Sequence, residues 1–73
     1  MGKRKITLSN HVRDYRARAG GMTQQELADR VGVTRQTVNA IEASKYSPSL
    51  EVAFLIARAL DARIEDIFSI STD

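Results

Sequence analysis

Two helix starts separated by a very short turn constrain this chain more than any other feature. Thr23 and Glu26 form a capping box, in which each side chain accepts a hydrogen bond from the other residue's backbone amide. Thr34 is a favoured N-cap for a second helix. The first helix ends at Gly32, so only residues 32–34 lie between the two. A turn this short predicts a steep helix crossing rather than an antiparallel hairpin.

Apolar side chains on the two helices recur at helical spacing and predict one shared buried face. Ala28 is small and allows the helices to approach closely. Met22 and Leu27 flank the first cap at the spacing of a hydrophobic staple, and Val33 and Val38 repeat that spacing at the second. The second helix therefore packs one side inward and turns its polar side outward. The inward positions are Leu27, Ala28, Val31, Val38 and Ile41.

Three further helices are expected around this pair. An apolar stripe from Leu8 to Ala19 predicts a helix that starts after Thr7 or Ser9 and runs to about residue 19. Pro48 and Ser49 mark the start of another, which runs to about residue 60, and a short one follows over residues 64–68. No alternating run is long enough to indicate a sheet. The sequence thus predicts an all-α fold of five helices.

The expected organisation is a single domain with short flanking segments. Residues 1–7 are predicted to form a flexible basic arm, residues 8–68 the folded domain, and residues 69–73 a loose C-terminal tail. With 73 residues, the chain buries only a small core. The core is expected to include Val31, Val38, Ile41, Phe54, Leu60, Ile67 and Phe68.

Charge is distributed unevenly along the chain, although the net charge is only +2. Residues 1–35 hold eight Lys and Arg against three acidic residues, whereas residues 36–73 hold three against six. This separation favours one face that binds a polyanion.

Composition narrows the function classes. The chain has no Cys and one His, which excludes disulfides, cysteine nucleophiles and His-pair metal sites. No metal or other cofactor is expected. Neither a nucleophile–base set nor a Gly-rich phosphate loop is present, so we expect no enzyme. The longest apolar run is residues 52–57, far too short to span a membrane. A cytoplasmic protein without a membrane role or a small-molecule effector is the expectation.

Residues 24–43 resemble the helix-turn-helix of the Xre family of phage repressor and Cro-type regulators. The similarity continues through residues 45–50 and 64–68 and covers about residues 8–68. It implies a compact five-helix bundle of the lambda-repressor-like type, which binds double-stranded operator DNA as a homodimer. Two departures stand out: Gly20-Gly21 lengthens the loop before the helix-turn-helix, and Ala43-Ser44 stands after its second helix where the family often has Gly or Asn.

The chemistry of the second helix predicts which residues contact DNA. Arg reads guanine, and Gln and Asn read adenine, through paired hydrogen bonds in the major groove. Gln24 opens the first helix, where a side-chain amide and the helix N-terminus can hold a phosphate. The predicted base-reading residues are Arg35, Gln36, Thr37, Asn39 and Ala40, the last through at most a thymine methyl. The predicted phosphate contacts are Gln24, Thr34, Lys45, Tyr46, Lys3, Arg4 and Lys5, the final three being equally compatible with a solubilising tail.

The predicted function is sequence-specific DNA binding that regulates transcription, as a repressor. The second helix is expected to enter the major groove of a palindromic operator, with a homodimer presenting two such helices. The last short helix and residues 68–70 are the leading candidates for the dimer contact. Glu42 is expected to serve a structural hydrogen bond or ion pair. The alternative is a protein-interaction role, such as an antitoxin, although few residues remain for a partner-binding segment.

Overall fold

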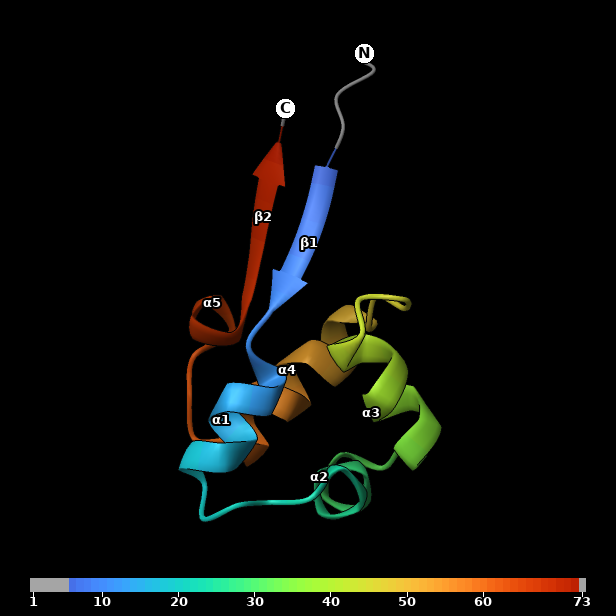
Figure 1. Ribbon diagram of the computed structural model, residues 1–73, viewed down its shortest axis with the longest axis vertical. Helices are drawn as coiled ribbons and strands as arrows, with labels where there is room; N and C mark the ends of the chain where they lie inside the picture. The colour runs from blue at the N-terminus through green and yellow to red at the C-terminus, as the bar shows by residue number, and fades with distance from the viewer. Residues whose placement is uncertain (1–5, 73) are drawn as a thin grey trace.

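The computed structural model describes the backbone of residues 6–72 and the side chains of residues 6–71. A helical body carries a two-stranded antiparallel ribbon, which extends away from the helices along the longest axis of the molecule (Figure 1). The molecule measures 41 × 21 × 19 Å. The elements in chain order are β1 (Ile6–Asn10), α1 (Val12–Arg18), α2 (Gln24–Val31), α3 (Arg35–Glu42), α4 (Leu50–Ala59), α5 (Ile64–Ile67) and β2 (Phe68–Thr72).

Side-chain caps fix the starts of α2 and α3, as the sequence predicts. The Thr23 hydroxyl accepts from the Glu26 amide at 3.0 Å, and the Glu26 carboxylate accepts from the Thr23 amide at 2.8 Å. The Thr34 hydroxyl accepts from the Thr37 amide at 3.2 Å and begins α3. Gly32 has φ +88°, a left-handed conformation that favours glycine, and it ends α2. The short turn of the helix-turn-helix is therefore confirmed.

The core lies where α1, α2, α3, α4 and α5 meet. Val31, Val38, Ile41, Leu60 and Ile67 are buried, as expected. Phe54, predicted to be buried, is instead 55% exposed, and Phe68 is only partly buried. Over the described residues, no helix is long and apolar enough to cross a bilayer.

The all-α prediction is wrong in one respect, because the chain also forms a small sheet. β1 pairs with β2 antiparallel, with Leu8 opposite Ile70 and Asn10 opposite Phe68. The first helix starts at Val12, so Leu8 lies on a strand rather than on that helix. Residues 69–72, predicted to be part of a loose tail, form β2 together with Phe68, which was predicted to end the last helix.

Residues 6–10 form a strand rather than the start of the predicted helix, because they pair with residues 68–72 from the other end of the chain. The His11 amide donates to the Ile67 carbonyl at 2.8 Å where the ribbon joins the helices. Residues 6 and 7, assigned to a flexible arm, belong to β1. A period-two apolar pattern is present in residues 6–9 and again in 68–71, but each segment is too short to indicate a strand without its distant partner.

Candidate nucleic-acid interface

The outward side of α3 presents a cluster of polar side chains. Arg35, Gln36 and Asn39 are exposed, as the sequence predicts. Thr37 and Ala40 are partly buried, and the Thr37 and Thr34 hydroxyls lie 3.0 Å apart, so part of the hydrogen-bonding capacity of Thr37 serves the helix cap. The side chains most available for hydrogen bonding to a ligand are therefore Arg35, Gln36 and Asn39.

A largely buried ion pair lies behind this face. The guanidinium of Arg16 on α1 donates two hydrogen bonds to the Glu42 carboxylate at the end of α3, from Nε at 2.7 Å and from Nη2 at 3.0 Å. Its Nη1 also donates to the Met22 carbonyl at 2.7 Å. The side chains of Arg16 and Glu42 are only 14% and 9% exposed. The hydrogen bond to Glu42 raises the pKa of Arg16, partly offset by burial. The structural role predicted for Glu42 is confirmed.

Gln24 connects this ion pair to the exposed face of α3. Its side-chain amide donates to Glu42 Oε1 at 3.1 Å and lies 3.4 Å from the Asn39 side-chain oxygen. Arg16, Glu42, Gln24 and Asn39 therefore form one hydrogen-bonded network across α1, α2 and α3. Sequence reasoning assigned Gln24 and Asn39 individually but missed Arg16, because nothing local to the chain pairs it with a residue 26 positions away.

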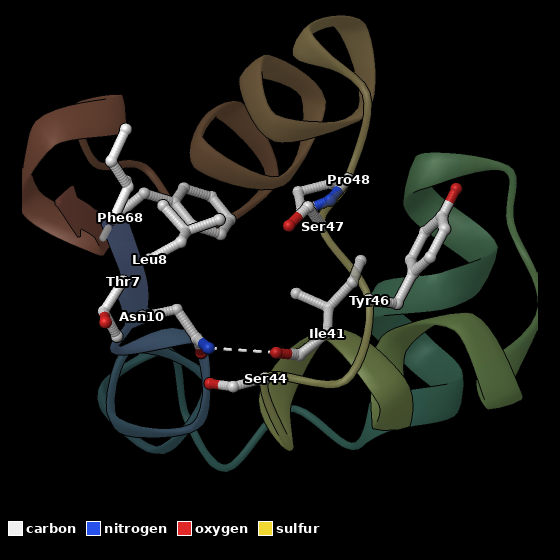
Figure 2. Close-up of a pocket in the computed structure, with 10 residues that line it drawn as sticks. Thr7, Leu8, Asn10, Ile41, Ser44, Tyr46, Ser47, Pro48 and Phe68 are labelled. Atoms are coloured by element: carbon white, nitrogen blue, oxygen red, sulfur yellow. Dashed lines mark hydrogen bonds between the residues drawn. The ribbon is translucent and has the colours of Figure 1, made fainter. Parts of the chain in front are cut away.

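The loop after α3 carries the remaining predicted contacts within the described residues. Lys45 and Tyr46 are exposed, and the Lys45 amide donates to the Ala40 carbonyl at 2.9 Å. Ser44 takes a left-handed φ of +59° at the departure noted in the sequence. Tyr46 lines the opposite side of a depression from Leu8 (Figure 2).

The predicted phosphate contacts divide into three groups. Gln24 and Thr34 stand at the starts of α2 and α3, and Lys45 and Tyr46 follow the end of α3. The third group, Lys3, Arg4 and Lys5, lies outside the described residues. The first two groups therefore flank α2 and α3, which pack against each other.

The amino-acid sequence matches known proteins along most of the chain. Residues 12–67 match the helix-turn-helix family. A relative from Methanothermobacter thermautotrophicus is 56% identical over 63 residues, which cover 85% of this chain and 90% of the relative. One from Archaeoglobus fulgidus is 51% identical over 61 residues, covering 84% and 86%. YgzD from Bacillus subtilis is 48% identical over 61 residues, covering 84% and 91%.

All three relatives carry the description of an uncharacterized HTH-type transcriptional regulator. The matched region includes the cap residues Thr23 and Thr34, the left-handed turn at Gly32 and the polar outer side of α3. The chain belongs to the helix-turn-helix family, and residues 24–43 form its Xre-type helix-turn-helix motif.

Proposed function

We propose that this protein is a transcriptional regulator that binds DNA by placing α3 in the major groove. The observation that carries the proposal is the exposed row of Arg35, Gln36 and Asn39 on a helix whose other side is buried at Val38 and Ile41. Guanidinium and amide groups are the side chains best suited to hydrogen-bond purine edges in that groove. The description of its relatives supports the same function.

Base reading is assigned to five residues of α3. Arg35 and Gln36 supply the principal contacts, since both are exposed on the first turn of the helix. Asn39 lies one turn further along, and Thr37 and Ala40, which are partly buried, contribute smaller contacts. The network from Arg16 through Gln24 supports this assignment because it restrains the Asn39 amide before DNA arrives.

Phosphate binding is assigned to groups that flank the reading helix. Gln24 begins α2, where unpaired backbone amides favour an anion, so we assign its backbone amide to the phosphate while its side-chain amide stays in the network with Glu42. Thr34 precedes α3, and Lys45 and Tyr46 follow it, so these contacts bracket the helix at both ends. Such contacts fix the register of a protein on DNA without reading its sequence.

The proposal includes a homodimer on a palindromic operator. A single module of this kind buries roughly 600–1,000 Å² on DNA, which gives limited specificity by itself. Two copies related by a two-fold axis would place their α3 helices one DNA turn apart, about 34 Å, or a multiple of it. We assign the protein to repression, because occupying an operator is sufficient to block transcription. We assign it to the cytoplasm as well.

Selection of bound duplexes from a random pool, repeated at two salt concentrations, tests this function. The expected result is one enriched motif, palindromic for a dimer, with an affinity that falls steeply as salt rises. The Arg35→Ala variant, carried through the same selection, should relax one position of the motif. A pool without an enriched motif would contradict operator reading.

A further inference from the structure

One of the proposed base-reading side chains, Asn39, is held by a neighbouring helix. Its Oδ1 atom lies 3.4 Å from Nε2 of Gln24, the first residue of α2, which donates to it. Gln24 Nε2 also donates to Glu42 Oε1 at 3.1 Å. Asn39 and Glu42 lie three positions apart on α3, so both face the same side of the helix, and Gln24 bridges them there.

The carboxylate of Glu42 determines which end of the Gln24 amide faces α3. Its Oε1 and Oε2 atoms accept from the Arg16 guanidinium at 3.0 and 2.7 Å, and its side chain is only 9% exposed. An ionised carboxylate accepts hydrogen bonds but donates none. The group of Gln24 beside it must therefore be the NH2 group, because a carbonyl oxygen at the same place would be repelled by the carboxylate.

The orientation of the Asn39 amide is fixed in the same way. A Gln side chain has two donor hydrogens, both on Nε2, and Gln24 directs one of them at Glu42. It directs the other at Asn39, so the group of Asn39 that faces it must be the oxygen rather than the NH2 group. Asn39 is exposed, and the NH2 group at the other end of its amide presents two donor hydrogens to a ligand.

A side chain that presents donors favours a different base from the adenine that the chemistry of an Asn side chain alone predicts. Bidentate binding of adenine needs Asn39 Oδ1 as the acceptor for the N6 amino group, in competition with Gln24. Guanine presents two acceptors, O6 and N7, in the major groove, whereas cytosine presents only a donor. The NH2 group of Asn39 therefore matches guanine best.

We infer that Gln24 is a positioning residue that makes Asn39 select guanine over adenine, with Glu42 setting the direction of both hydrogen bonds. This inference rests on the proposed function, since it names the base that one of the reading residues prefers. Gln24 acts through Asn39 rather than by touching a base, because both donor hydrogens of its side chain are bound within the protein.

Adjacent glutamines on α2 provide a matched pair of variants. Gln24→Met removes the donor to Asn39 and keeps an uncharged side chain of similar length. Gln25→Met makes the same substitution at an exposed residue whose amide donates to the Asp29 carboxylate, at 2.9 Å within α2. Gln24→Lys restores a side chain that can only donate hydrogen bonds. Circular dichroism verifies that each variant folds.

Asn39→Ala first identifies the base position that Asn39 reads, as the position at which the selected motif relaxes. Affinities for duplexes that carry guanine or adenine at this position then give a base-preference ratio for each protein. Wild type and Gln25→Met should share one ratio in favour of guanine, and Gln24→Met should reduce it by about three- to tenfold. Gln24→Lys should keep the preference. In the Asn39→Ala background, Gln24→Met should leave the ratio unchanged.

A wild-type preference for adenine at this position, a motif that Asn39→Ala leaves intact, or an unchanged ratio in Gln24→Met overturns the inference. So does a Gln24→Met variant that loses discrimination equally at the position read by Arg35, since that indicates a structural role. A pool without an enriched motif refutes the proposed function instead. Slower exchange of the side-chain NH2 protons of Gln24 than of the exposed Gln36 in the free protein then still supports the amide orientation, and equal exchange overturns it.

Discussion

Arg16 and Glu42 form a bidentate ion pair that joins α1 to the end of α3, with Nε to Oε2 at 2.7 Å. The same carboxylate accepts from Gln24, which approaches Asn39 on the exposed side of the helix. The pair therefore connects the packing of α1 to the position of a proposed base-reading side chain. Both side chains are largely buried. Removing one partner should therefore change the unfolding free energy differently from replacing both partners together.

Removal of one partner of this pair should destabilise the protein strongly. Arg16→Met leaves the Glu42 carboxylate without its ion-pair partner in a site that is 9% exposed, and the expected loss is about 3 kcal/mol of unfolding free energy. The double variant Arg16→Met, Glu42→Met removes both charges and should recover much of that loss. Urea unfolding of the four proteins in a double-mutant cycle measures the coupling. Additive effects would show that the pair does not contribute as a unit.

Substitutions at Arg35 and Lys45 should separate base reading from phosphate binding. Arg35→Ala is expected to cost about 1–3 kcal/mol on the selected duplex and to relax one base position. Lys45→Ala should weaken binding to every duplex to a similar extent and reduce the slope of log affinity against log salt by about one unit. Titrations of matched and mismatched duplexes at several salt concentrations measure both effects. Identical behaviour of the two variants would refute the assigned roles.

The capping box should make part of the stability depend on pH. Hydrogen bonds from the Thr23 backbone and side chain lower the pKa of Glu26 below its ordinary value. Since the folded-state pKa is lower than the unfolded one, the stabilisation is present above the ordinary value and is lost as pH falls through the folded-state pKa. Glu26→Gln retains a weaker capping group without the charge.

Wild type should therefore exceed Glu26→Gln in stability near neutral pH, and the difference should shrink at an acidic pH well below the ordinary pKa of a glutamate, where the carboxylate takes up its proton. Urea unfolding midpoints at both pH values measure it. Glu26 is exposed, so the comparison with Gln at each pH is more informative than the absolute change. A difference that is independent of pH would indicate that the charge contributes nothing to the cap.

Local signals predict the helix-turn-helix well because each of its determinants lies within a few residues. Thr23, Glu26, Gly32 and Thr34 act on backbone groups at most three or four positions away, and all four do so as expected. The ribbon depends instead on pairing such as Leu8 with Ile70, across nearly the whole chain. Exposure of Phe54 could not be predicted either, since an apolar position on a helix stripe indicates burial without specifying what covers it.

The candidate site likewise has a part that local sequence predicts and a part that depends on the tertiary fold. Arg35, Gln36 and Asn39 follow from their positions on α3, because a helix with one apolar side must expose the other. The network of Arg16, Glu42 and Gln24 could not be predicted in this way, because the contact between Arg16 on α1 and Glu42 on α3 depends on the tertiary packing of these helices. Residue chemistry thus predicts which groups are presented, whereas the tertiary fold determines which of them are held in place.

Asn10 should be the residue that fixes the ribbon to the helical body. Its side-chain oxygen accepts from the Val12 amide at 3.1 Å, and its amide donates to the Ile41 carbonyl at the end of α3 at 2.9 Å (Figure 2). Asn10→Ala removes both hydrogen bonds and should cost about 1–3 kcal/mol of unfolding free energy. Asn10→Asp keeps the acceptor for Val12 but sets a carboxylate oxygen against the Ile41 carbonyl oxygen, so its loss should be at least as large.

Amide hydrogen exchange distinguishes local opening from global unfolding in these variants. The His11 amide, which donates to the Ile67 carbonyl where the ribbon meets the body, should lose more protection in Asn10→Ala than the Ala53 amide of α4. That pattern is expected because the side chain holds the entry of α1 against both α3 and the ribbon. Equal loss of protection at the two amides would mean that Asn10 stabilises the whole fold rather than the junction between the ribbon and the helices.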